Sequence, residues 1–102
     1  MDRDEIIARL KAEEPALRAR GVQGLSLFGS LARGEAGPQS DVDVAITIDR
    51  GIVPPGFASF ALLDGLSGDL CRLLNRKVNV VPVVGARTRI AARIARDRVR
   101  VF

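Results

Sequence analysis

The chain has no histidine, no tyrosine and no tryptophan, and it contains one cysteine, Cys71. Without histidine, catalysis by Ser-His or Cys-His pairs and zinc held by histidine are excluded. A lone cysteine cannot form a disulfide within the chain, which fits a reducing compartment, and we expect Cys71 to be a small core residue. The four phenylalanines are scattered, so nucleic acid, which stacks on aromatic platforms, is not expected as a direct ligand.

No apolar run approaches the ~20 residues that span a bilayer. The charged, amphipathic start MDRDEIIARL lacks the pattern of a signal peptide, so we expect a cytoplasmic protein without membrane contact. Lysine is scarce, and arginine supplies nearly all of the 16 basic residues, which exceed the 12 acidic residues to give a net charge of +4. A length of 102 residues suits one domain, taken as 1–102.

Hydrophobic periodicity predicts alternating helices and strands. Helices are predicted at 3–13, 15–20, 57–75 and 87–96, with a helical turn at 30–34. Strands are predicted at 22–28, 41–49 and 77–84, and the final VRVF forms a last short strand. Pro82 implies an edge position or a strand end. This order predicts a compact α/β (α+β) domain in which a small sheet packs with helices.

The clearest strand, DVDVAITID, carries two aspartates, Asp41 and Asp43. Strand alternation places its branched apolar side chains on one face and the aspartates on the other. Two carboxylates that project together beside a loop repel each other, and a divalent cation relieves that repulsion. Mg²⁺ prefers oxygen ligands, often one or two carboxylates plus substrate phosphates. The strand therefore predicts a magnesium site.

A turn before this strand has the features of a phosphate site. Gly29 ends an apolar run and lets the backbone approach a ligand closely. The N–H groups that open a helical turn, with the Ser30 hydroxyl, make an anion site. Arg33 lies one turn further and could contact a phosphate, with a salt bridge to Glu35 or Asp41 as the alternative. With the two aspartates, this turn predicts an enzyme that acts on nucleoside triphosphates.

The stretch GSLARGEAGPQSDVDVAI resembles the signature of the minimal nucleotidyltransferases, small members of the DNA polymerase β-like superfamily. Gly29 and Ser30 are followed by ten residues and then by Asp41-x-Asp43, with ARG at 32–34 and SD at 40–41 also in place. The LFGS start, the long middle helix and the KVNVV strand extend the resemblance over essentially the whole chain. It implies a mixed-sheet nucleotidyltransferase fold.

The resemblance also implies a reaction, in which AMP is transferred from ATP to an acceptor hydroxyl. Asp41 and Asp43 would hold Mg²⁺, with two ions expected. The nucleotide would be bound by Gly29, Ser30, Arg33 and Ser40. Many such proteins pair with a separate helical HEPN protein, an RNA-cleaving toxin, and some AMPylate a tyrosine of that toxin. An ATP-dependent antitoxin in a hetero-oligomer with a HEPN-type toxin is therefore implied.

One position departs from the family pattern. Where these proteins usually carry a third carboxylate, in a VDVV-like strand, this chain has VNVV with Asn79 at the matching catalytic position. An amide carries no charge and cannot take a proton from the incoming hydroxyl. Three interpretations stay open: a slow enzyme, an enzyme in which another carboxylate such as Asp49 substitutes, or a protein that binds nucleotide and partner without transfer.

Two further features have a structural and a functional interpretation. The stretch 86–102 holds six arginines against Asp97, and a solvated basic helix docked by Ile90 and Ile94 is favoured over a patch for an acidic partner or RNA. Phe57 and Phe60 are expected to cap the leucine-rich core, with an exposed partner patch as the alternative. A stand-alone RNA- or antibiotic-modifying enzyme is disfavoured because the chain has little room for an acceptor site.

Overall fold

The computed structural model describes residues 2–35, 37, 40–83 and 88–102. Its helices are α1 (Arg3–Ala12), α2 (Glu14–Arg20), α3 (Gly29–Ala32), α4 (Phe57–Leu74) and α5 (Thr88–Asp97). Its strands are β1 (Val22–Phe28), β2 (Val42–Ile48), β3 (Val78–Pro82) and β4 (Val99–Arg100). The predicted order of elements is confirmed, and the predicted ends at 84 and 87 lie outside the described residues. Within the described part of the chain, no helix has the length and apolarity needed to cross a membrane.

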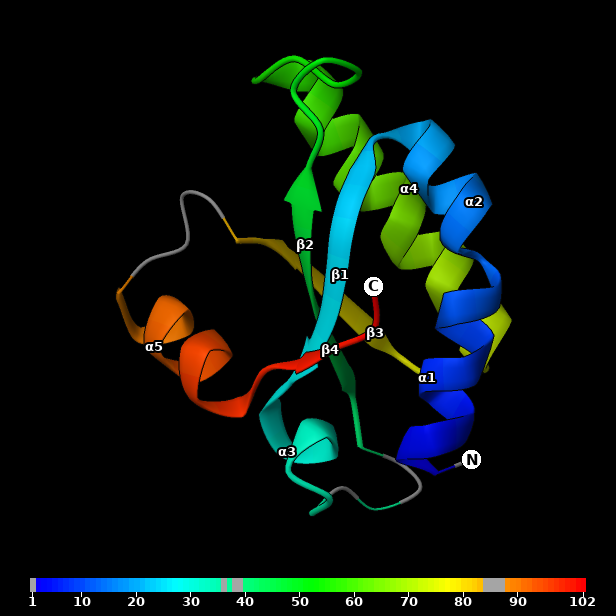
Figure 1. The fold of residues 1–102 in the computed structure, drawn as a ribbon, viewed down its shortest axis with the longest axis vertical. Helices are drawn as coiled ribbons and strands as arrows, with labels where there is room; N and C mark the ends of the chain where they lie inside the picture. Colours follow the sequence, from blue (N-terminus) through cyan, green and yellow to red (C-terminus); the bar gives the residue numbers. More distant parts are fainter. Residues whose placement is uncertain (1, 36, 38–39, 84–87) are drawn as a thin grey trace.

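The four strands form one mixed sheet in the order β3-β2-β1-β4 (Figure 1). Strand β1 runs antiparallel to β2 and to β4, whereas β2 and β3 are parallel. A parallel pair needs a long crossover connection, and α4 provides it. Pro82 ends β3, which is an edge strand, as its missing N–H predicts. The predicted small sheet packed with helices is therefore confirmed.

Different helices cover the two faces of the sheet. Helices α1, α2 and α4 pack on one face, over the main core, which takes the branched apolar side chains of β2. Helix α5 lies over the other face, where Ile94 packs with Phe28 and Ala45. Because strand side chains alternate, Asp43 shares the face of Ala45. The aspartates therefore lie on the α5 side of the sheet.

Local signals explain where the first elements begin and end. Asp2 caps α1 by accepting a hydrogen bond from the Glu5 N–H at 2.9 Å. Gly21 ends α2 with φ +109°, a left-handed conformation that favours glycine. Strand β1 then begins at Val22 and runs directly into Gly29. This places the glycine–serine turn at the end of a central strand.

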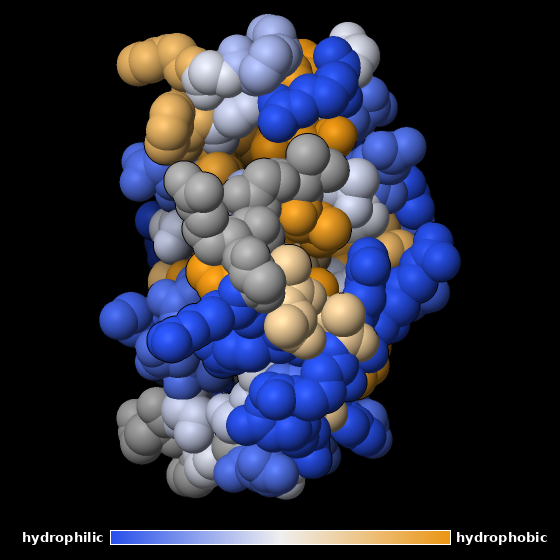
Figure 2. Space-filling view, turned by 90° about the vertical axis from the view of Figure 1, so that its left-hand side faces the viewer, coloured by the Kyte–Doolittle hydropathy of each residue, from blue (hydrophilic) through white to orange (hydrophobic). Residues whose placement is uncertain are grey.

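The expectation for Phe57 and Phe60 is wrong, because neither side chain caps the core. Their exposed fractions are 89% and 73%. The buried row of α4 consists of Leu62, Leu66, Leu70 and Leu74. Phe57 and Phe60 lie five and two residues before Leu62, which at about 100° per residue turns them to the opposite side of the helix. Figure 2 shows hydrophobic side chains protruding at the end of the molecule where α4 begins.

The basic stretch forms the predicted solvated helix. Ile94 is buried and Ile90 packs beside it, so the isoleucines dock α5 on the sheet as expected. Arg93 and Arg96 stay exposed, and hydrophilic side chains dominate the lower half of this face (Figure 2). Arg87 lies outside the described residues. Elsewhere, Cys71 is half-buried and packs against the main core, as predicted.

Candidate active site

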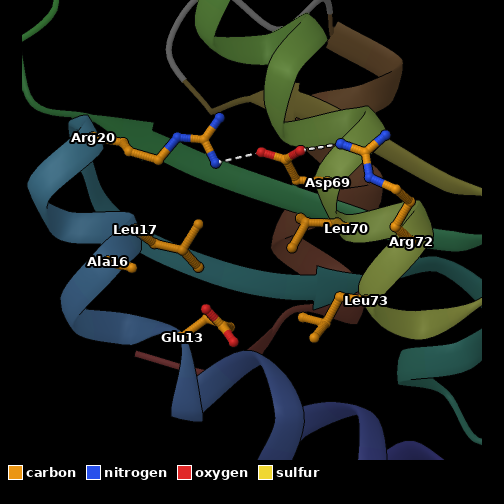
Figure 3. A pocket seen from close by; sticks show the side chains of 8 residues that line it. All are labelled: Glu13, Ala16, Leu17, Arg20, Asp69, Leu70, Arg72 and Leu73. Atoms are coloured by element: carbon orange, nitrogen blue, oxygen red, sulfur yellow. Dashed lines mark hydrogen bonds and ion pairs between the residues drawn. The ribbon is translucent and has the colours of Figure 1, made fainter.

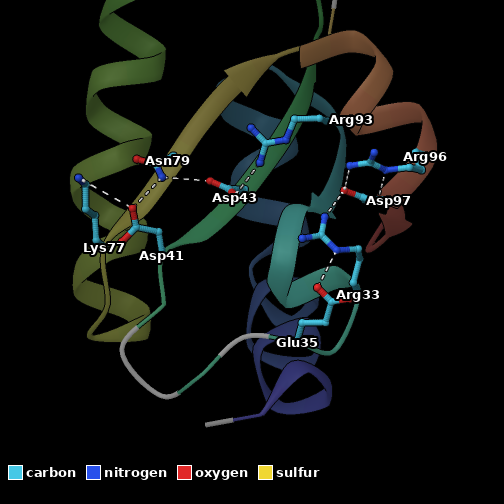
Figure 4. Close-up of polar contacts among 9 residues, drawn as sticks. All are labelled: Arg33, Glu35, Asp41, Asp43, Lys77, Asn79, Arg93, Arg96 and Asp97. Atoms are coloured by element: carbon cyan, nitrogen blue, oxygen red, sulfur yellow. Dashed lines mark hydrogen bonds and ion pairs between the residues drawn. The ribbon is translucent and has the colours of Figure 1, made fainter. Parts of the chain in front are cut away.

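Asp41 and Asp43, here called the acidic pair, stand at the start of β2 beside β3. Asp43 and Asn79 are register partners in the parallel pair of strands. Asn79 Nδ2 donates hydrogen bonds to Asp41 Oδ2 at 3.2 Å and to Asp43 Oδ1 at 3.0 Å (Figure 4). Both carboxylates therefore converge on one nitrogen atom, and the amide partly offsets their mutual repulsion.

Gly29 brings the glycine–serine turn directly against the acidic pair. Its φ of +77° is a conformation that other residues rarely adopt. A Cβ at this position would lie 2.4 Å from Asp43 Oδ2, so no larger residue fits without moving the carboxylate. Phe28, just before it, is the register partner of Asp43 in the antiparallel pair β1–β2. The turn and the acidic pair thus share one end of the sheet.

Each carboxylate of the acidic pair also has a cation beside it. Lys77 Nζ lies 3.9 Å from Asp41 Oδ2, and Arg93 Nη2 lies 3.7 Å from Asp43 Oδ2. Both distances exceed the roughly 2.7–3.2 Å of a direct hydrogen bond, so these ion pairs are loose. The Arg93 guanidinium also lies over the Phe28 ring, 5.6 Å from its centroid. Protein cations thus partly balance the negative charge of the site.

Among the described residues, Arg33, directly after α3, contacts Asp97 and Glu35 rather than the acidic pair (Figure 4). Its Nη1 donates to Asp97 Oδ2 at 2.6 Å and its Nε donates to Glu35 Oε2 at 3.1 Å. Arg96 Nε donates to the other oxygen of Asp97 at 2.9 Å. Of the alternatives for Arg33, the salt bridge to Glu35 is confirmed, and Asp97 rather than Asp41 is the second partner.

Asp97 is buried at the contact between α3 and α5, with a side chain that is 1% exposed. Hydrogen bonds from Arg96 and from Arg33 lower the pKa of Asp97 below its ordinary value, although burial opposes this shift. The carboxylate therefore stays ionised and joins the two helices. We call Arg33, Arg96 and Asp97 the α3–α5 junction.

Ser40 directly precedes the acidic pair. Its Oγ accepts a hydrogen bond from the Gly37 N–H at 3.0 Å. Its carbonyl accepts one from Arg76 Nη2, which also donates to the Gly37 carbonyl at 3.2 Å. These contacts fix the backbone just before Asp41. A nucleotide contact stays a prediction for Ser40, as it does for Gly29, Ser30 and Arg33.

The donor set of the acidic pair suits a hard divalent cation. The carboxylate oxygens of Asp41 and Asp43 converge, and Asn79 can add an amide oxygen when its amide group is turned over. Among the residues that the structure describes, no group of three or more histidine, cysteine or acidic side chains is placed to hold a metal. Water and phosphate oxygens would therefore complete the coordination of an ion held here.

Asp49 does not replace the missing third carboxylate. It directly follows β2, six residues after Asp43, so about 20 Å of strand separates the two. Its Oδ1 accepts a hydrogen bond from the Gly51 N–H at 2.9 Å, within the turn that leaves the strand. The interpretation in which Asp49 substitutes is therefore wrong, and the slow enzyme and the binding protein stay open.

Sequence reasoning missed the contact of Arg93 with Asp43 and that of Asp97 with Arg33, because α5 follows both partners by 45 residues or more. One signal could have found Asp97. It is an acidic residue at the C-terminus of a basic helix, where the helix dipole disfavours a carboxylate that lacks a cationic partner. For Arg93, nothing in the sequence distinguishes it from the neighbouring arginines.

A cavity of about 450 Å³ lies in another part of the molecule, between α2 and α4 (Figure 3). Leu17, Leu70 and Leu73 line it together with a row of ion pairs. In that row Arg20 Nη1 lies 2.8 Å from Asp69 Oδ2, and Asp69 also pairs with Arg72. Because α2 and α4 cover the sheet face opposite α5, this cavity does not belong to the acidic pair.

A family model and a known protein both match this chain. Residues 4–101 match the model of a family described as nucleotidyltransferase domain. The protein adenylyltransferase MntA of Thermococcus cleftensis is 33% identical over 99 residues, which are 96% of this chain and 94% of that protein. Each match extends over nearly the whole chain.

Solved structures share the fold. A minimal nucleotidyltransferase superposes with a TM-score of 0.76 at 27% identity, over 97% of this chain and 95% of that chain. A chain from the complex of a tri-AMPylated Shewanella oneidensis HEPN toxin with an MNT antitoxin superposes with a TM-score of 0.59 at 19% identity, over 90% and 68% of the two chains. The chain therefore belongs to the nucleotidyltransferase domain family and has the fold of its minimal members.

Proposed function

We propose that this chain is a Mg²⁺-dependent nucleotidyltransferase that transfers AMP from ATP to a hydroxyl of a partner protein. The family and the similarity to a protein adenylyltransferase support the reaction class. The partner would be a HEPN-type toxin, with this chain as its antitoxin in a hetero-oligomer. The similarity to the Shewanella complex of HEPN toxin and MNT antitoxin supports this pairing.

The observation that carries the proposal is the meeting of the acidic pair with the glycine–serine turn. Asp41 and Asp43 converge on one atom, and Gly29 lies against Asp43 closely enough to exclude a Cβ. Binding a triphosphate with its metal takes acidic side chains that hold the cation. It also takes a backbone turn that the phosphates can approach closely. In this sheet they stand within one small region.

The reaction forms one bond and breaks another. The acceptor oxygen bonds to the α-phosphorus of ATP, the bond from this phosphorus to the bridging oxygen breaks, and pyrophosphate leaves. Gly29 and Ser30 would bind the triphosphate, and Asp41 and Asp43 would hold Mg²⁺, which neutralises charge on the phosphate oxygens when bound. The proton of the acceptor hydroxyl passes to solvent or to another group, because Asn79 cannot accept it.

The acceptor would come from another molecule. The chain has no tyrosine, so a tyrosine acceptor of the kind that the family resemblance implies cannot be its own. The acidic pair is reachable from outside, since Asp41 is exposed and Asp43 is half-buried. A partner segment that carries a hydroxyl can therefore approach the triphosphate at this end of the sheet.

The test replaces each aspartate of the acidic pair. Asp41→Ala and Asp43→Ala should each lower transfer by about a thousandfold or more, because charge neutralisation by a metal contributes several kcal/mol to such reactions. Transfer is measured with ATP labelled at the α-phosphate and the purified toxin as acceptor. Asp49→Ala, at the other end of β2, is the matched control and should transfer normally. Undiminished labelling by either acidic-pair variant would refute the mechanism.

The second candidate is a nucleotide-binding protein that neutralises its partner by occlusion, and Asn79 favours it. Without the third carboxylate, transfer can be slow enough to play no part in neutralisation. Mixing the chain with its toxin in the absence of ATP separates the two functions. Immediate and complete inhibition supports occlusion, whereas inhibition that needs ATP and time supports transfer.

A further inference from the structure

Arg93 of α5 reaches into the acidic site from the helix that covers it. Its Nη2 lies 3.7 Å from Asp43 Oδ2 and 3.5 Å from the position that a Cβ on Gly29 would take. The guanidinium, the carboxylate and the glycine turn therefore meet at one point, as Figure 4 shows for the two side chains. A polyphosphate bound along the Gly29 backbone would lie within reach of this guanidinium.

The contacts of Arg93 leave its guanidinium available to a ligand. Its side chain is 48% exposed, and its ion pair with Asp43 is longer than a hydrogen bond. The ring of Phe28 supports the guanidinium from below without using its N–H donors. Arg33 and Arg96 differ, because direct hydrogen bonds tie both to the buried Asp97. Among the described residues, Arg93 is therefore held in place while its N–H donors stay available for hydrogen bonds.

We propose that Arg93 is a triphosphate-binding residue that pairs with Asp43 in the ligand-free protein and moves to the phosphates beyond the α-phosphate when nucleotide binds. This rests on the proposed function, since it takes ATP as the ligand. A divalent cation and the guanidinium compete for the same carboxylate oxygen of Asp43. When the cation binds, the guanidinium is released, and the planar fork of arginine suits two phosphate oxygens.

Replacing Arg93 should change the affinity for the metal alone and the affinity for ATP in opposite directions. Removing Arg93 removes a competitor for Asp43, so the metal alone should bind more tightly. The same change removes a charged donor to the nucleotide, so ATP with Mg²⁺ should bind more weakly. AMP lacks the outer phosphates, and its affinity should not change. A merely structural role would lower all three affinities together.

The experiment uses the full chain and three ligands: Mn²⁺, ATP and AMP. Arg93→Ala should bind Mn²⁺ alone several-fold more tightly, measured from the electron paramagnetic resonance signal of the free ion. By calorimetry with Mg²⁺, it should bind ATP about tenfold to a hundredfold more weakly, the range expected for a charge-assisted hydrogen bond. Arg93→Lys keeps the charge and should fall between the variant and the original chain. Arg9→Ala removes the same charge from α1, on the opposite sheet face, and should change neither affinity.

The outcomes separate this inference from the proposed function. If the original chain binds ATP and Arg93→Ala binds it equally well, Arg93 is not a phosphate ligand, and the proposed function still stands. If Arg93→Ala loses affinity for AMP and Mn²⁺ as well, the residue acts on the shape of the site and the inference is overturned. If the original chain binds no ATP in the presence of Mg²⁺, both proposals fail. Cooperative thermal unfolding of both Arg93 variants verifies that they are folded.

Discussion

Two carboxylates, Asp97 at the end of α5 and Asp43 on β2 beneath this helix, are held in very different ways. Asp97 is 1% exposed and accepts direct hydrogen bonds from two arginines, whereas the side chain of Asp43 is 20% exposed and has its arginine at 3.7 Å. A saturated, buried carboxylate serves the fold, because exchange of its partners would leave charges unpaired. A partly exposed and loosely paired one can accept a new cation. The same helix thus supplies a structural contact at one turn and a ligand-binding group at another.

Asn79→Asp should have the largest effect of the substitutions considered, because it adds a third negative charge beside Asp41 and Asp43. A carboxylate there can take the proton of the acceptor hydroxyl, and general bases contribute about a hundredfold to ten-thousandfold. We therefore expect a rise of this size in the initial rate of AMP transfer, measured with labelled ATP. An unchanged rate would mean that another group or solvent already takes the proton.

Gly29→Ala tests the contact between the turn and the acidic pair. A left-handed backbone costs a non-glycine residue about 1–2 kcal/mol, and the new Cβ would displace Asp43. A displacement of this kind should lower transfer by about a hundredfold. Gly34→Ala is the matched control, because Gly34 has φ +76° but a Cβ there would meet nothing within 4 Å. The control should unfold more easily and yet transfer normally, and equal losses of transfer would contradict the assignment.

Asp97→Asn weakens the contacts of the buried carboxylate, which pairs with two arginines. The variant should melt several degrees lower at neutral pH, because it removes the charge that Arg33 and Arg96 share. The pKa of Asp97 is lowered in the folded chain, so its contribution is complete above the unfolded value of about 3.9 and is lost as the pH falls further. The difference in melting temperature should therefore shrink below about pH 4.

The difference in melting temperature is measured by circular dichroism between pH 3 and pH 7, roughly the range in which the lowered pKa of Asp97 acts. Asp69→Asn is the control, because Asp69 is paired with arginines in a more exposed place and its loss should change the melting temperature little. A melting difference that stays constant over the whole pH range would contradict the role given to Asp97.

Phe57→Ser and Phe60→Ser should have the smallest effect. Both side chains are exposed at the start of α4, so the free energy of unfolding should change by no more than about 0.5 kcal/mol. Urea denaturation measures this change. A loss comparable to that of a buried leucine would show that the phenylalanines cap the core after all.

Most of the fold followed from short-range signals. Alternation in β2, a leucine row in α4 and glycine at the end of α2 each depend on neighbours along the chain. The acidic pair followed in the same way, because Asp41 and Asp43 are two residues apart on one strand. Asn79 was placed in the site through the family pattern, and the register of β2 and β3 sets it beside Asp43.

The rest depended on contacts between distant segments. The partner of Arg33 is Asp97, 64 residues later, and no local pattern distinguishes it from Glu35, which is two residues away. The error at Phe57 has another cause. Apolar character alone suggested burial, whereas the rotation of the helix relative to Leu62 decides which side a residue faces.

Asn79 has a consequence for how this protein can change over generations. Asparagine and aspartate have nearly the same shape, and their codons differ by a single base. Because pairing with β2 already aims this side chain at two carboxylates, one nucleotide change would exchange an amide for an acid without rebuilding the backbone. Under the two candidate functions proposed above, a single mutational step would exchange neutralisation by contact for neutralisation by chemistry.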